Sequence, residues 1–134
     1  MTQNLAAIAL LVDDYDAAVA YYTGVMGFEL LEDTPHGLGK RWVRVAPPGS
    51  TGTSILLARA STDAQRARIG DQTGGRVGLF LHTDDFDRDY HALSARGVRF
   101  REVPRQETYG KVAVFEDCYG NAWDLIQPSS AALP

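Results

Sequence analysis

The chain contains two stretches in which the same elements follow in the same order, and this internal repeat limits the fold more than any other feature. The first stretch opens with the apolar run Leu5 to Val12, and the acidic tetrapeptide 13–16 follows it. The second opens with the run Arg76 to His82, and the tetrapeptide 84–87 echoes the first at a separation of 84 − 13 = 71 residues. Self-similarity of this kind is the sequence signature of a supersecondary unit that occurs twice.

The first copy predicts a strand, a helix and three further strands. Residues 5–12 form too short an apolar run for a comfortable helix and indicate a buried strand. Tyr15, Val19, Tyr22 and Met26 recur at helical spacing, and Gly27 is a natural helix stop. Strands are then expected at 28–31, 41–46 and 54–58, with a loop over 34–39.

The second copy repeats this pattern after residues 59–75, which are rich in Ala, Arg, Gln and Gly and are expected to form a linker with one or two helical turns near 63–69. A strand at 76–82 leads into a helix that begins near Phe86 and ends at Gly97. A strand at 98–100 follows. The copy ends in a hairpin, in which strands 112–115 and 122–126 flank a tight turn at 117–121. The expected fold is therefore α+β: two paired βαβββ modules, 5–58 and 76–128, form one domain with a curved mixed sheet around a concave cavity and with the helices outside.

Composition excludes several classes of function. The 134 residues carry a net charge of −4, which argues against nucleic acid as a partner because that would need a basic face. No apolar run approaches the ~18 residues of a membrane span, and the N-terminus shows no secretory leader. Cys118, the single cysteine, can form no internal disulfide, and the expected location is the cytoplasm.

Several short motifs resemble one known superfamily. They are Tyr21-Tyr22-Thr23-Gly24-Val25-Met26-Gly27-Phe28 after the first helix, Gly97-Val98-Arg99-Phe100, Tyr109-Gly110, and the turn Phe115-Glu116-Asp117-Cys118-Tyr119-Gly120-Asn121. The chain resembles the vicinal oxygen chelate superfamily, which includes glyoxalase I, bleomycin resistance proteins and extradiol dioxygenases. The match runs from Leu5 to Pro128 and departs at Cys118, where such proteins commonly carry Pro. The resemblance implies the paired βαβββ fold and a homodimer, but a fold does not fix a reaction.

The resemblance also implies where metal ligands should lie. Metal-dependent members place His, Glu or Gln on the first and last strand of each module. Carried over to this chain, those positions fall on Ala7, Leu56, Asp124 and either Gly78 or Arg76. One carboxylate cannot hold a divalent ion, which needs several oxygen or nitrogen donors. We therefore expect neither a metal nor another cofactor.

Seven residues are candidates for ligand binding, and for each an ordinary structural role remains open. They are Trp42, Arg44, Arg76, Phe80, His82, Tyr109 and Asp124. Trp42 and Arg44 share a strand face, and an aromatic ring beside a guanidinium suits a planar or anionic ligand. Otherwise the two lie on an exposed strand face. Phe80 either forms cavity wall or fills core, and Tyr109 either reaches a ligand or bonds backbone. His36 and His91 are expected to be solvent-exposed.

Asp124, His82 and Tyr109 are the candidates for catalysis. A carboxylate among apolar residues must be paired, be a ligand, or face a wet cavity. For Asp124 we expect an ion pair with Arg76 or Arg44, and a role as general base or ligand anchor is the alternative. His82 either bonds a ligand or caps the turn that follows it. No neighbouring cation or helix N-terminus activates Cys118.

Two functions remain. The first is metal-free binding of a small, partly aromatic or anionic organic molecule, with a homodimer and neither nucleic acid nor membrane as partner. The second is a metal-dependent or acid–base enzyme of the same superfamily, either a glyoxalase-like lyase or a dioxygenase.

Overall fold

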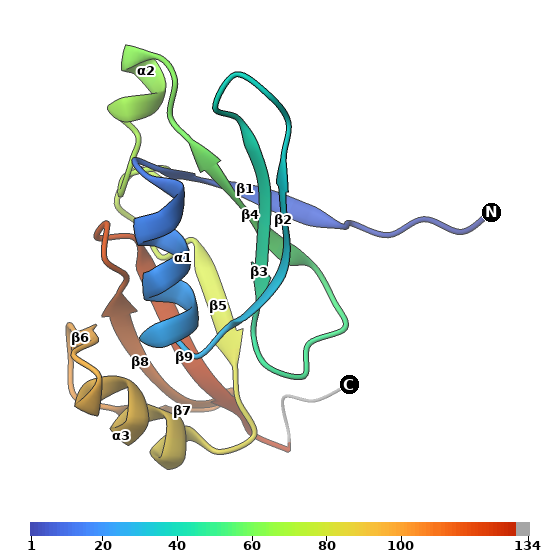
Figure 1. Ribbon diagram of the computed structural model, residues 1–134. Helices are drawn as coiled ribbons and strands as arrows, with labels where there is room; N and C mark the ends of the chain where they lie inside the picture. The colour runs from blue at the N-terminus through green and yellow to red at the C-terminus, as the bar shows by residue number, and fades with distance from the viewer. Residues whose placement is uncertain (131–134) are drawn as a thin grey trace. The chain divides into compact units, whose positions relative to one another are not determined.

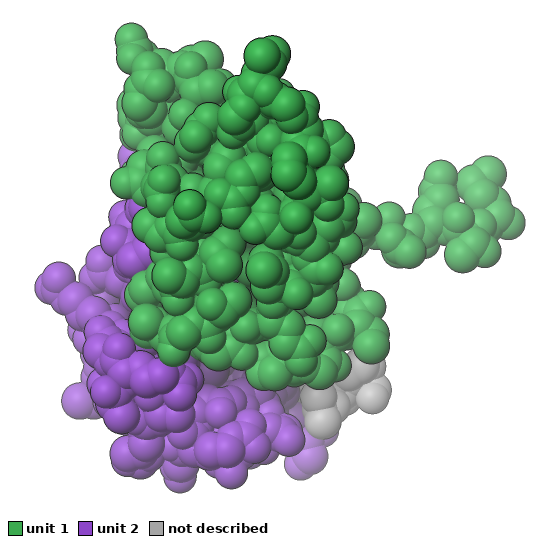
Figure 2. Space-filling model, viewed as in Figure 1, with its two compact units in different colours: residues 1–69 green, residues 70–134 purple. Residues whose placement is uncertain are grey.

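The computed structural model describes residues 1–130 and consists of two compact units, residues 1–69 and 70–134 (Figure 2). Each unit has its own β-sheet (Figure 1). No helix in the described residues is long and apolar enough to cross a membrane.

The first unit is a βαβββ unit with a short helix after it. Its strands lie in the order β1-β4-β3-β2, with β1 parallel to β4 and the other pairs antiparallel. The bounds are β1 Ala7–Val12, α1 Tyr15–Gly24, β2 Glu29–Pro35, β3 Arg41–Ala46, β4 Ser54–Arg59 and α2 Asp63–Arg66.

Helix α1 begins where the sequence predicts, because the side chain of Asp14 accepts a hydrogen bond from the backbone N–H of Ala17, 2.7 Å away. The apolar stripe of α1 packs against β2, β3 and β4. Val43 and Val45 of β3 point to this side and are fully buried, as is Tyr22 of the helix. The alternation in β3 therefore turns Trp42 and Arg44 to the opposite face of the sheet.

The second unit repeats this topology with one added strand. Its sheet has the order β5-β9-β8-β6, in which β5 is parallel to β9, and the short β7 also pairs with β8. The bounds are β5 Leu79–His82, α3 Phe86–Ala95, β6 Arg99–Phe100, β7 Arg105–Glu107, β8 Gly110–Glu116 and β9 Ala122–Pro128. Residues on one sheet face form a core with Phe86 and Leu93 of α3, namely Ala113, Phe115, Trp123 and Leu125. The predicted α+β fold and its two βαβββ repeats are confirmed.

Four local predictions were inaccurate. Helix α1 ends at Gly24, not at Gly27, although Met26 is still buried. β2 extends to Pro35 because its pairing with β3 continues into the first two residues of the segment 34–39, which was expected to be a loop. β5 begins only at Leu79. β7 was not expected, since its three polar residues carry no apolar alternation.

Candidate functional site

A cavity opens in the first unit where β3 and β4 stop pairing. The two strands are in register only at Arg44 with Leu56 and at Val45 with Ile55. Beyond these pairs the strands diverge around a cavity of about 390 Å³, which we call the β3–β4 cavity. Its lining residues are Tyr15, His36, Lys40, Arg41, Trp42, Leu56, Leu57, Ala58 and Arg59. The volume lies within the range of small-molecule sites.

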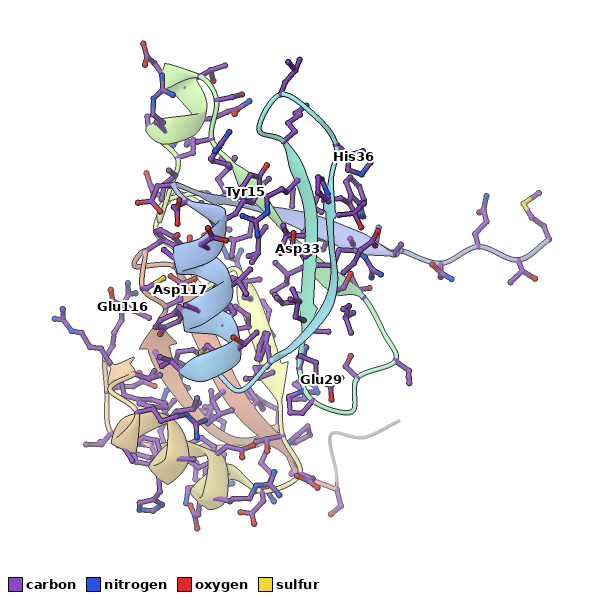
Figure 3. All side chains as sticks on the ribbon, in the orientation of Figure 1. Tyr15, Glu29, Asp33, His36, Glu116 and Asp117 are labelled. Atoms are coloured by element: carbon purple, nitrogen blue, oxygen red, sulfur yellow. The ribbon has the colours of Figure 1, made fainter. Side chains whose placement is uncertain are left out.

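Tyr15, the first residue of α1, lines this cavity. Figure 3 labels Tyr15 at the start of the helix. Its hydroxyl oxygen accepts a hydrogen bond from the backbone N–H of Arg41, 3.2 Å away. The guanidinium carbons of Arg41 and Arg59 each lie 5.1 Å from the centre of the Tyr15 ring, within the range of a cation–π contact. The start of α1 therefore holds two arginines at the cavity.

The charge of Arg41 is already neutralised. Its Nε and Nη2 donate to the two carboxylate oxygens of Asp33 at 3.0 and 2.6 Å, and its Nη1 donates to Asp16 at 2.8 Å. The hydrogen bond from Arg41 holds the pKa of Asp33 below its ordinary value. The same carboxylate, with Asp16, raises the pKa of Arg41. Arg41 thus acts as a fixed structural cation between β2, β3 and α1.

The aromatic wall of the cavity is formed by Trp42 and His36. Their ring centres are 6.1 Å apart and the planes meet at 60°, an edge-to-face arrangement. Trp42 is 42% exposed, so a large part of the indole is accessible to a ligand. His36 is exposed as predicted, but it also lines the cavity, which was not foreseen.

Arg44 lies on the same face as Trp42 but does not line the cavity. Its Nε donates to Glu32 of β2 at 3.0 Å, and its Nη1 donates to the hydroxyl oxygen of Ser54 at 3.1 Å. Arg44 therefore ties three strands together within the first unit.

In the second unit the sheet face opposite α3 carries three predicted site residues. The register pairs Phe80 with Asp124 and His82 with Ile126, so all four side chains share that face. Phe80 is 56% exposed, and His82 at the end of β5 is exposed as well. Both are therefore accessible rather than core residues.

Asp124 is 8% exposed, and its Oδ1 has no hydrogen-bond partner within the described residues. Burial raises the pKa of this carboxyl, while the positive charge of Arg105 opposes the rise. The predicted ion pair with Arg76, the candidate in the same unit, is wrong. Arg76 lies outside β5, is exposed, and donates to the carbonyl of Val77 instead.

Arg105 is the cation that the sequence did not reveal. It lies on the same face as Asp124, since its register partner in β8 is Val112. Its guanidinium donates to Glu102 at 2.7 Å, to Glu107 at 2.8 Å and to the hydroxyl of Tyr109 at 3.4 Å. Tyr109 is thus held by an arginine side chain, and Arg105 is neutralised by two glutamates.

Strand register also locates the positions at which the resemblance implies metal ligands. Leu56 faces Ala9 in the first sheet as Asp124 faces Phe80 in the second, so Leu56 and Asp124 are equivalent. Ala7 pairs with Ser54, and Gly78 precedes β5. Of these positions only Asp124 offers a side-chain donor. Nowhere in residues 1–130 do three or more His, Cys, Asp or Glu side chains gather as a metal would require. The residues present at these positions do not fit a divalent metal centre.

His91 and Cys118, which were also considered from the sequence, lie outside the strands that carry the other site residues. His91 is exposed on α3, where its Nδ1 lies 2.7 Å from the carbonyl oxygen of Asp87. Cys118 is exposed in the turn between β8 and β9.

Comparison with known proteins identifies the family. Residues 4–125 match the model of the Glyoxalase/Bleomycin resistance protein/Dioxygenase superfamily. The chain belongs to this superfamily. An uncharacterized protein of Shewanella frigidimarina is 54% identical over 128 residues, which cover 95% of each chain.

Solved structures of the superfamily share the fold. A member from Sphaerobacter thermophilus has a TM-score of 0.79 and 30% identity, with 94% of this chain and 98% of that chain covered. TnmS3, an antibiotic-binding protein from a Streptomyces species, has a TM-score of 0.76 and 34% identity, with 96% and 98% covered.

Trp42 is the single cavity residue among the seven ligand-binding candidates, and the polar or aromatic cavity residues that the sequence did not single out are Tyr15, His36, Lys40, Arg41 and Arg59. Tyr15 was assigned to the helix core, and Arg59 was placed at the start of the linker. These residues come together at the cavity because β3 and β4 diverge there, and no local sequence pattern predicts that divergence.

Proposed function

We propose that this protein binds a small, partly aromatic or anionic organic molecule in the β3–β4 cavity, and that it does so without a metal ion. The observation that carries the proposal is the lining of the cavity. An accessible indole, a histidine and a tyrosine ring stand beside three cationic side chains in about 390 Å³. Apolar and aromatic walls with a few polar groups are typical of small-molecule sites.

The relatives support this proposal. TnmS3 is described as an antibiotic-binding protein, and it is 34% identical to this chain over nearly the full length of both. Metal independence is supported by the donor set, because the positions equivalent to metal ligands carry Ala7, Leu56, Gly78 and Asp124.

A thermal-shift screen tests the proposal. Aromatic antibiotics, thiol conjugates and catechols are added separately, since a ligand that binds only the native state raises the melting temperature. We expect at least one compound to raise it in a saturable manner. Trp42→Ala should abolish that shift, whereas Val103→Ala, which removes an exposed apolar side chain in the second unit, should leave it intact. Equal shifts in both variants would contradict the cavity as the site.

A second candidate function is acid–base catalysis at the sheet face of the second unit. The supporting observation is Asp124, which is buried with one oxygen unpartnered and has a raised pKa. A buried carboxyl with a raised pKa holds its proton more readily than an exposed one and is suited to act as a general acid or base. If a compound of the screen is turned over, Asp124→Asn should abolish the turnover and leave binding in the β3–β4 cavity unchanged. If Asp124→Asn lost both the turnover and the binding, the proposal that catalysis and binding use separate sites would be rejected.

We also propose that the protein forms a homodimer. Edge strands β2 and β5 leave Leu30, Leu31 and Phe80 largely exposed, and unpaired strand edges with apolar side chains favour association.

A further inference from the structure

The cationic side chains of the β3–β4 cavity differ in whether they are already paired. Arg41 is held by Asp33 and Asp16, so its charge is neutralised. Arg59 has no carboxylate within ion-pair distance in the described residues. Its Nη2 donates only to the backbone carbonyl of Gly39, at 3.1 Å.

Lys40 is the second unneutralised cation at this cavity. It is exposed, and its ammonium forms no hydrogen bond or ion pair with any residue from 1 to 130. Its backbone closes the turn between β2 and β3, because its N–H donates to the carbonyl of Gly37 and its carbonyl accepts from the N–H of His36. The turn therefore fixes the base of the Lys40 side chain at the cavity rim.

Tyr15 fixes the position of Arg59. The guanidinium lies over the tyrosine ring, with 5.1 Å between its central carbon and the ring centre. A guanidinium over an aromatic ring still has its N–H groups to donate, and one of them is used by the carbonyl of Gly39. The other N–H groups of Arg59 can bind an anionic oxygen while the contact with Tyr15 is kept.

We propose that the β3–β4 cavity selects ligands that carry an anionic group, a carboxylate, sulfonate or phosphonate, on an aromatic body. Arg59 and Lys40 bind the anionic group, and Trp42 and His36 contact the aromatic body. The inference rests on the proposed function and makes it more specific by naming the ligand class and the two residues that select it. Charged hydrogen bonds give such selection because they are stronger than neutral ones.

Two fluorescent probes with the same skeleton test the inference. 8-Anilinonaphthalene-1-sulfonate carries a sulfonate, and N-phenyl-1-naphthylamine is the same molecule without it. Dissociation constants are measured for both probes against the full-length protein. We expect the sulfonate to bind about tenfold more tightly, and its affinity alone to fall as added salt screens the attraction.

Variants assign the selectivity to residues. Arg59→Gln and Lys40→Gln should each weaken binding of the sulfonate about fivefold and leave the uncharged probe unaffected. Arg99→Gln is the matched control, since Arg99 is exposed in the second unit and 3.8 Å from Glu116. It should change neither constant. Because the Lys40 ammonium forms no hydrogen bond or ion pair in the described residues, its variant remains informative even if Arg59→Gln fails to fold.

The failures of the two proposals are distinguishable. If both probes bind equally well, or if neither cation variant changes their ratio, the anion inference is overturned. The proposed function then survives, provided that Trp42→Ala weakens both probes. If neither probe binds saturably, both the anion inference and the proposed aromatic binding site in the β3–β4 cavity are rejected.

Discussion

The carboxylate of Asp117 accepts a hydrogen bond from the indole Nε1 of Trp123, 3.3 Å away, across the turn that joins β8 to β9. The same carboxylate accepts from the backbone N–H of Tyr119 and from both the backbone and the side chain of Asn121. Figure 3 labels Asp117 beside Glu116, at the end of β8. This carboxylate therefore holds the turn and one ring of the core together.

Asp117→Ala should lower the free energy of unfolding by about 2–4 kcal/mol, because it removes the carboxylate that accepts hydrogen bonds from buried Asn121 and Trp123. Urea denaturation followed by tryptophan fluorescence measures the change. Asp63→Ala is the control, because the Asp63 side chain is fully exposed and pairs only with Arg66 in the same short helix. An unchanged midpoint for Asp117→Ala would show that the turn does not need its carboxylate.

Gly110→Ala should destabilise the second unit by about 2–4 kcal/mol. Gly110 has a φ of 149°, and an added Cβ would lie 2.2 Å from the backbone oxygen of Gln127 in the paired strand. The same denaturation experiment applies to Gly24→Ala at the end of α1, where an added Cβ meets no atom within 4 Å. That control should be neutral or stabilise by up to about 1 kcal/mol. Equal effects in both variants would contradict the β8–β9 register.

The stability difference between Asp124→Asn and the wild type should depend on pH. Burial holds the native pKa of Asp124 above its ordinary value of 3.8, so the native state binds more protons than the unfolded chain between those two values. The wild type therefore loses stability as pH rises through this window, and the asparagine variant does not. The free energy of unfolding of Asp124→Asn, relative to that of the wild type, should increase from pH 3 upward and stay constant above the native pKa of Asp124.

For Asp33→Asn we expect the opposite pH dependence of the stability difference from the wild type. The hydrogen bond from Arg41 lowers the pKa of Asp33, so this carboxylate contributes stability above 3.8 that is lost as pH falls through the native pKa. The free energy of unfolding of Asp33→Asn should therefore decrease relative to that of the wild type as pH rises. If both variants follow the same pH trend, the environment assigned to Asp124 is wrong.

The proposed homodimer predicts twice the chain mass by light scattering at micromolar concentration. Introducing charge on an exposed apolar edge, by Leu31→Lys in β2 or Phe80→Lys in β5, should shift the equilibrium towards the monomer through like-charge repulsion and loss of apolar contact. Val103→Lys, at an exposed apolar position outside the strands, should leave the mass unchanged. A wild-type protein that stays monomeric at high concentration would contradict the dimer.

Much of the fold followed from the sequence because both copies carry strong local signals. The helical spacing of apolar residues predicted helix starts at Tyr15 and near Phe86, and in the structure Asp14 and Asp85 cap the two helices. Alternation predicted β3 to the residue, and the turn at 117–121 was predicted from its Asp, Gly and Asn. The polar strand β7 was not predicted, because it is defined by its pairing with β8 and not by the burial of apolar side chains.

The candidate site was only partly predictable. Trp42 was found because strand parity is a local property. Arg59 and Lys40 were missed because their placement depends on the point at which β3 and β4 cease to pair. Arg105 was missed as the cation near Asp124 for a similar reason, because it reaches that sheet face through strand β7, which was not predicted.

A titration of 8-anilinonaphthalene-1-sulfonate with and without metal tests the central claim, metal-free binding in the β3–β4 cavity, most directly. The protein is dialysed against EDTA, its metal content is measured, and the dissociation constant is compared with that of protein supplied with zinc, manganese, nickel or iron. We predict one saturable site with the same constant in every sample, and loss of that site in Trp42→Ala. Binding that disappears with EDTA and returns with one metal would contradict the account.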